Sequence, residues 1–244
     1  MIEITDPLFW LIVTGSFVAS FVNAAFALGG AFIMLALMTS ILPISAVIPL
    51  HTPLMFGSLI SRTFLFWRYI YWPVVIPFSL GCLIGVFVGA RVYIDLPDWI
   101  IALVIGLLML SVWVPNFKLP VNIPKPFFVV GIIHSFMSTV FAYGGIFHTI
   151  VLRNGLEKMQ ITATIAGSLL TMGIMKITGY ATFGFDYMPY IWVIVDAVLV
   201  SIVGTWLGKR VTHHISEALF KLIFKLIMTL FGLRLLYQSW QLFQ

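Results

Sequence analysis

The chain has 244 residues, of which 61% are apolar and only 9% are charged, and its net charge is +5. A soluble domain carries roughly a quarter of its residues as charged side chains, so this composition excludes a soluble globular protein. The 55 residues between Asp6 and Arg62 hold no Asp, Glu, Lys or Arg. As one helix they would measure about 80 Å, against about 30 Å of membrane hydrocarbon, which predicts at least two spans.

The spans are predicted to be helices, because the apolar runs are continuous and lack the alternation of barrel strands. The single cysteine, Cys82, excludes a disulfide framework and a cysteine-rich metal site. The charges are scattered through the connections, which gives no support to nucleic-acid binding. Charge-free runs separated by Pro and Gly predict about eight hydrophobic segments. They are 8–28 with a continuation to 42, 44–67, 70–92, 98–115, 127–152, 158–182, 187–208 and 216–242.

The two halves of the chain resemble each other in sequence. Residues 25–33 and 140–148 agree at five of nine positions at an offset of 115, and both stretches contain a Gly-Gly pair. Residues 85–92 and 204–211 agree at four of eight positions at an offset of 119. Two matches in the same order indicate a duplicated unit. We expect one repeat of about four segments at 1–115, a proline-rich linker at 116–126, and a second repeat at 127–244.

Membrane transporters are commonly built from two related repeats with the substrate site between them. Residues 8–42 are too long for one crossing and too short for two, and Gly29-Gly30 interrupts them. The predicted fold is therefore an all-α polytopic membrane protein of two repeats, with broken or re-entrant helices at Gly29-Gly30 and Gly144-Gly145. Whether the repeats are parallel or inverted stays open.

The Gly-Gly pairs are the best candidates for a substrate site. Glycine lowers helix propensity by about 1 kcal/mol, and unwound backbone inside a membrane must line protein or a wet cavity. A helix that restarts there offers unpaired N–H groups and a positive dipole end to an anion. The alternative is close helix packing through small residues, and that is our interpretation of Gly85, Gly89, Gly204 and Gly208.

Three charges lie inside the apolar segments, where they are costly. Arg62 and Lys176 occupy nearly corresponding places in the two halves and would suit an anionic substrate, although both could instead extend to an interface. Asp196 could pair with Lys176 or take up a proton, and we expect it to couple transport to protons.

Polar side chains gather beside these features. Pro49 and Pro53 flank His51 and should break the helix, and the matching stretch 160–168 is rich in hydroxyls. Beside the second glycine pair lie His134, Ser135, Ser138 and Thr139, each of which alone more often makes an inter-helix hydrogen bond. The predicted substrate-binding residues are Asn23, Gly29, Gly30, His51, Arg62, Tyr143, Gly144, Gly145, Thr162, Thr164, Ser168 and Lys176.

Metal and catalytic motifs are not evident in the sequence. His51, His134 and His148 are scattered and lack zinc-site spacing, and no nucleophile–base constellation stands out. We therefore expect no metal, no cofactor and no enzymatic activity.

The repeated stretches 26–32 and 141–147, together with the two-unit layout, resemble the TauE/SafE family of sulfite and organosulfonate exporters. The resemblance spans nearly the full length. It implies a multi-pass permease of the prokaryotic plasma membrane that exports a small sulfur-containing anion, often driven by a proton or sodium gradient. A homo-oligomer is compatible with this prediction.

Two alternatives come from other classes of protein. Asp196 and the scattered histidines would also fit a membrane-embedded enzyme or assembly subunit with a closed polar pocket. A cation or metal permease could use Asp196, His51 and His148, although the buried cations argue against it.

Overall fold

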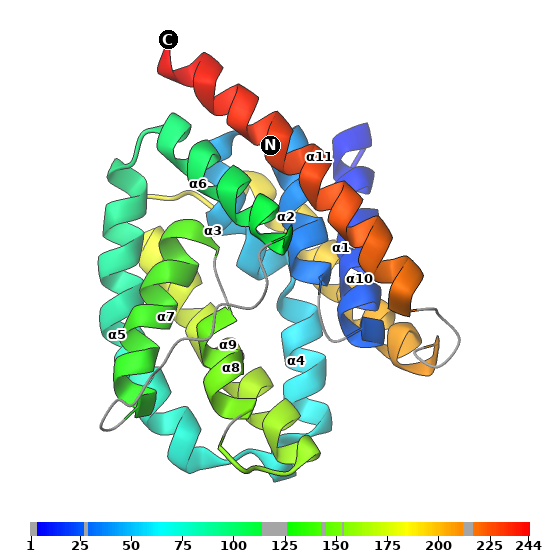
Figure 1. Ribbon diagram of the computed structural model, residues 1–244, viewed down its shortest axis with the longest axis vertical. Coiled ribbons are helices and arrows are strands. Elements are labelled where there is room, and N and C mark those ends of the chain that lie inside the picture. The colour runs from blue at the N-terminus through cyan, green and yellow to red at the C-terminus, as the bar shows by residue number, and fades with distance from the viewer. Residues whose placement is uncertain (1–3, 27–28, 114–125, 143–144, 153, 212–216) are drawn as a thin grey trace. The chain divides into compact units, whose positions relative to one another are not determined.

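The computed structural model describes residues 4–26, 29–113, 126–142, 145–152, 154–211 and 217–244. All secondary-structure elements in this part of the chain are α-helices or short 3-10 helices, and it contains no strand (Figure 1). The elements in chain order are α1 (Pro7–Phe26), α2 (Gly30–Ile41), α3 (Ile44–Leu54), α4 (Phe56–Leu65), η1 (Trp67–Tyr69), α5 (Trp72–Asp95), α6 (Asp98–Leu110), η2 (Ser111–Trp113), α7 (Pro126–Phe141), α8 (Gly145–Leu152), α9 (Lys158–Thr182), η3 (Met188–Tyr190), α10 (Ile191–Val211) and α11 (Glu217–Phe243). The predicted linker, 116–126, lies outside the described residues except for its last residue.

Six stretches of the described chain are long and apolar enough to cross a membrane. The prediction of an all-helical polytopic membrane protein is thereby confirmed. The six stretches are Pro7–Phe26, Ile44–Leu65, Trp72–Asp95, Met159–Thr182, Met188–Arg210 and Leu222–Phe243.

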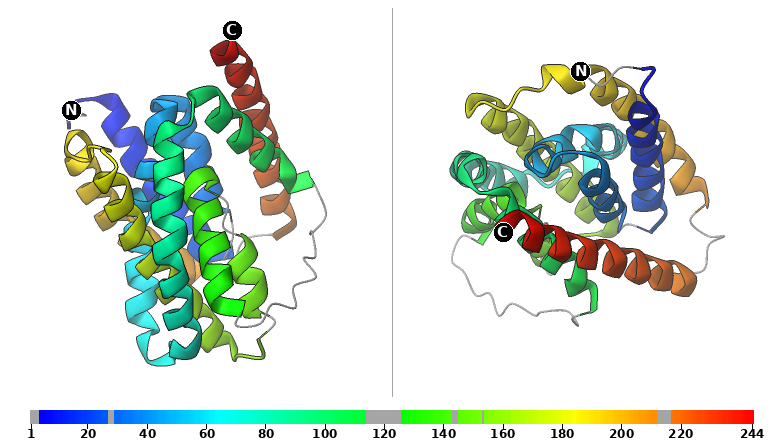
Figure 2. Two further views of the ribbon diagram at one scale, coloured as in Figure 1. Left: turned by 90° about the vertical axis from the view of Figure 1, so that its left-hand side faces the viewer. Right: turned by 90° about the horizontal axis from the view of Figure 1, so that it is seen from above.

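The chain forms two compact units, which divide within α4 between Ser58 and Leu59. Unit 1 contains α1, α2, α3, α6, α10 and α11. In it, α1 packs along α10, and α11 packs along α6, as both views of Figure 2 show for the latter pair. Unit 2 contains most of α4 with α5, α7, α8 and α9, and its main contacts join α5 to α7 and to α9 (Figure 1). Each unit therefore combines helices from both halves of the sequence.

The glycines of α5 and α10 lie at helix–helix contacts, as the sequence predicts. A Cβ on Gly85 of α5 would lie 2.2 Å from the carbonyl oxygen of Ile132 in α7. A Cβ on Gly204 of α10 would lie 2.5 Å from the carbonyl oxygen of Phe17 in α1. Since real Cβ atoms do not approach oxygen this closely, glycine is what permits both helix pairs to pack backbone against backbone.

At both Gly-Gly pairs the second glycine is the first residue of a new helix, α2 or α8. α1 ends at Phe26, and α2 begins at Gly30 after Gly29, whose φ of 96° is in the left-handed region that glycine adopts easily. α7 ends at Phe141, and Ala142 has a φ of 56° before α8 begins at Gly145.

The predicted proline break separates α3 from α4 at Met55. Pro53 has no N–H to offer the carbonyl of Pro49, and the Tyr187 hydroxyl donates to that carbonyl at 3.3 Å instead. Burial raises the pKa of Tyr187 above its ordinary value, so this hydroxyl keeps its proton and remains a donor.

Candidate functional site

The C-terminal end of α7 is held by two side chains of α9. The last carbonyls of a helix have no partner inside the helix, and inside a membrane they need one from the protein. The Lys176 ammonium donates to the carbonyl oxygen of Ser138 at 3.0 Å and approaches its Oγ at 3.5 Å; this carbonyl also accepts the backbone N–H of Ala142 at 3.1 Å. The Tyr180 hydroxyl, one turn further along α9, donates to the carbonyl oxygen of Thr139. The interruption between α7 and α8 is therefore stabilised by tertiary contacts.

Lys176 is a buried cation that has no counter-ion among the described residues of unit 2. Its side chain is 2% exposed, so it does not extend to the surface of the unit. The acidic residues of unit 2 are Asp95, which pairs with Arg91 at 3.3 Å, and Glu157, which caps the first turn of α9. Among the described residues of unit 2, the ammonium thus meets only a carbonyl and a hydroxyl. An anion bound beside it would supply the missing negative charge.

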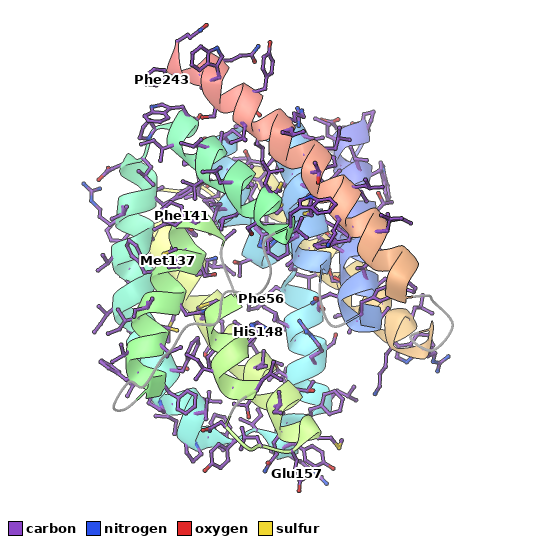
Figure 3. The ribbon with its side chains drawn as sticks, in the orientation of Figure 1. Phe56, Met137, Phe141, His148, Glu157 and Phe243 are labelled. Atoms are coloured by element: carbon purple, nitrogen blue, oxygen red, sulfur yellow. The ribbon has the colours of Figure 1, made fainter. Side chains whose placement is uncertain are left out.

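The N-terminal end of α8 is held by a histidine of α7. The backbone N–H of Phe147, in the first turn of α8, donates to Nδ1 of His134 at 3.3 Å. His134 is fully buried, and its ring lies 5.7 Å from that of Phe78 and 5.8 Å from that of Phe147, measured between centroids. Figure 3 shows Met137 and Phe141 on successive turns of α7 and His148 on α8.

The three hydroxyl residues of α9 that were predicted to bind substrate differ in burial and in hydrogen bonding. Thr164 is buried, and its Oγ1 accepts the backbone N–H of Tyr71 at 3.0 Å, just before α5. Ser168 is buried, and its Oγ has no hydrogen-bond partner among the described residues. Thr162 is half-buried in the second turn of the helix. Ser168 and Lys176 both lie on α9 with a spacing of i and i+8, which places them within one broad face of a helix.

The first break, in unit 1, is closely packed. A Cβ on Gly30 would lie 1.9 Å from the carbonyl oxygen of Ala19 and 2.6 Å from Cβ of the half-buried Asn23. Glycine is therefore required at position 30 for α2 to fold back on α1. His51 of α3 joins this region, with its Nε2 2.8 Å from the carbonyl oxygen of Ala31. A substrate contact by these residues stays a prediction.

The remaining predicted residues are dispersed. Arg62 is half-buried on α4 in unit 2, and Asp196 is half-buried in the second turn of α10 in unit 1. Tyr143 and Gly144 lie outside the described residues, and Gly145 is the first residue of α8. Of the predicted substrate-binding residues, Lys176 is the one whose side chain contacts the second break, which is the interruption between α7 and α8.

His134, Ser138, Thr139 and Tyr180 complete the second break but were not among the predicted substrate-binding residues. One signal in the sequence points to Ser138, because it occupies the position of Asn23 at the repeat offset of 115. No sequence pattern points to Tyr180, whose partner is 41 residues away.

Comparison with known proteins agrees with these features. Residues 12–235 match the protein family described as sulfite exporter TauE/SafE. No curated protein and no solved structure matches the chain. In the described residues there is no group of three His, Cys, Asp or Glu side chains that could hold a metal ion. With a match over most of its length and six apolar helices, the chain belongs to the TauE/SafE family of sulfite exporters, a family of multi-pass membrane transporters and not of enzymes.

Proposed function

We propose that the protein is a secondary transporter that exports a small sulfur-containing anion, such as sulfite or an organosulfonate, across a prokaryotic plasma membrane. The observation that carries this proposal is the burial of the Lys176 ammonium, which has no carboxylate partner among the residues of unit 2 that the structure describes. A buried charge is costly unless it is paired, and a transported anion would complete the pair during part of each cycle. A permease for cations or metals would need a carboxylate at this place.

The matched packing of α5 and α10 supports the duplicated fold. Gly85 faces the carbonyl of Ile132, and Gly204 faces the carbonyl of Phe17. Ile132 and Phe17 are separated by 115 residues, the same offset as the two Gly-Gly stretches. We infer that the chain is a duplication in which the third long helix of each half packs on the first helix of the other half.

The two short helices after the glycine pairs support discontinuous elements in the transport path. α2 has 12 residues and α8 has 8, so they measure about 18 and 12 Å, which is less than the about 30 Å of a bilayer core. In our proposal both elements are re-entrant and their N-terminal ends face the substrate. Asp196 takes up the proton that couples the cycle, with sodium as the alternative coupling ion.

Reconstitution tests the proposal directly. Proteoliposomes containing the full chain should release labelled sulfite or a labelled C2 sulfonate, and Lys176→Met should lose most of that flux. The matched control is Lys225→Met, which removes the same charge from α11, where the ammonium lies 4.7 Å from the centre of the Trp113 ring.

The thermal stability of both variants is measured alongside the flux, because Lys176 also holds the C-terminal end of α7. Wild-type flux in a folded Lys176→Met protein would remove this residue from the site. Absence of flux of both anions in the wild-type protein would refute the proposed function.

A further inference from the structure

The second break contains a buried nitrogen for which the described residues supply no hydrogen-bond partner. His134 is fully buried, and its Nε2 has no hydrogen-bond partner among the described residues. A buried N–H without a partner is rare in native structures and destabilising, so such a group needs a physical explanation.

The hydrogen bond at the other ring nitrogen determines the protonation state of His134. Nδ1 accepts the backbone N–H of Phe147 at 3.3 Å, so it cannot carry a proton. An imidazole with one acceptor nitrogen is neutral and has its N–H at Nε2. The ring also packs beside the Phe78 and Phe147 rings, whose own centroids are 3.9 Å apart, and this packing restricts the orientation of the imidazole. His134 is therefore a pre-oriented, uncharged donor.

A cation lies close to this donor. Ser138, whose carbonyl oxygen and hydroxyl hold the Lys176 ammonium, follows His134 by four residues on α7. Residues at this spacing lie on one face of a helix, with Cβ atoms about 5–6 Å apart. His134 also interacts electrostatically with Lys176 and with His148 of α8. One ammonium beside one neutral N–H matches an anion with at least two acceptor oxygens.

We propose that His134 binds the transported anion, donating its Nε2–H to a sulfur-bound oxygen while Lys176 neutralises the charge. This inference rests on the proposed function and adds to it a residue with two roles. Through Nδ1, His134 holds the N-terminal end of α8, and through Nε2 it contacts the ligand. The site favours an anion that accepts hydrogen bonds, because a ligand without an acceptor atom would leave the N–H unsatisfied; the sulfur-bound oxygens of the proposed substrates are such acceptors.

Two substitutions separate the two nitrogens. In His134→Asn, the side-chain oxygen can still accept the Phe147 N–H, but no donor remains at the Nε2 position. In His134→Gln, the amide N–H takes the place of Nε2–H, but the Nδ1 acceptor is lost. Binding of sodium sulfite and of 2-hydroxyethanesulfonate to the purified full-length protein is measured by calorimetry, and thermal unfolding is recorded for each variant.

We expect His134→Asn to remain folded, with a lower unfolding temperature because the ring contacts with Phe78 and Phe147 are lost. It should bind both anions about 10- to 100-fold more weakly, the effect of losing one hydrogen bond to a charged group. His134→Gln should be less stable but should bind more tightly than His134→Asn. Wild-type affinity in His134→Asn would overturn the inference while leaving the proposed function intact. Failure of the wild-type protein to bind either anion would overturn both.

A spectroscopic measurement on the wild-type protein does not depend on the folding of a variant. Ring-¹⁵N-labelled histidine should show His134 as the Nε2–H tautomer, with an Nε2–H resonance that shifts when sulfite or the sulfonate is added. An Nδ1–H tautomer, or a resonance unaffected by saturating anion, would overturn the inference.

Discussion

The substitution Gly85→Ala tests the packing of α5 on α7. A Cβ at this position would lie 2.2 Å from both the carbonyl oxygen of Ile132 and Oγ of Ser135, whereas ordinary van der Waals contact begins near 3.4 Å. The two helices would have to separate by about 1 Å, and a gap of that size forfeits up to about half of the dispersion energy between the atoms concerned. We therefore expect overpacking to cost about 1–3 kcal/mol.

The intrinsic preference of alanine for helices acts in the opposite direction and is worth about 1 kcal/mol. Gly167→Ala isolates this preference within the same unit, because the three atoms nearest to its Cβ would all belong to the Ile70 side chain, at 3.4 Å or more, which is ordinary van der Waals contact. Thermal unfolding of the purified variants should show a lower midpoint for Gly85→Ala and an unchanged or higher one for Gly167→Ala. For a chain of this size each kcal/mol corresponds to about 2–4 °C.

The contact of α10 with α1 provides a second comparison. A Cβ on Gly204 would lie 2.5 Å from the carbonyl oxygen of Phe17, so Gly204→Ala should destabilise the protein in the same direction as Gly85→Ala. If both variants unfolded at the same temperature as Gly167→Ala, the backbone contacts would not be limiting and the reasoning would be wrong.

Two further predictions concern charges in unit 1. Arg234 of α11 donates to Oγ of Ser40 at 2.8 Å and to the carbonyl oxygen of Thr39 at 3.3 Å, at the C-terminal end of α2. Arg234→Met should therefore lower stability by about 1 kcal/mol, measured by thermal unfolding, and equal stability would argue against this capping role. Asp196→Asn should retain anion binding but lose the dependence of flux on an imposed pH gradient, and full dependence in that variant would remove Asp196 from proton coupling.

Much of the architecture could be predicted from the sequence, because it depends on local properties. Apolar run length sets the helices: the predicted segment 158–182 coincides with α9, and 216–242 differs from α11 by one residue at each end. Proline and glycine act on their own backbone, so the interruptions after Pro53 and around the glycine pairs also fall where the sequence indicates. The Gly-x-x-x-Gly spacing likewise predicted the packing faces of α5 and α10, because the lack of a side chain is a property of glycine itself.

The candidate site could be predicted only in part. Lys176 is conspicuous in sequence because a charge in an apolar helix is costly wherever it lies. Its hydrogen-bond partner Ser138 could not be identified from the sequence, because the two residues are 38 positions apart and their contact depends on how α7 and α9 pack. The same holds for Tyr180 and Thr139.

The sequence by itself determined that this chain is a bundle of apolar helices with interruptions at its glycine and proline pairs, because hydrophobicity and backbone freedom are properties of each segment. Only the tertiary structure decided how the interrupted ends are satisfied. The carbonyls of Ser138 and Thr139 accept hydrogen bonds from Lys176 and Tyr180, and the N–H of Phe147 donates to His134, whose opposite ring nitrogen has no partner among the described residues. Such pairings depend on distances between helices, and those distances are set by packing.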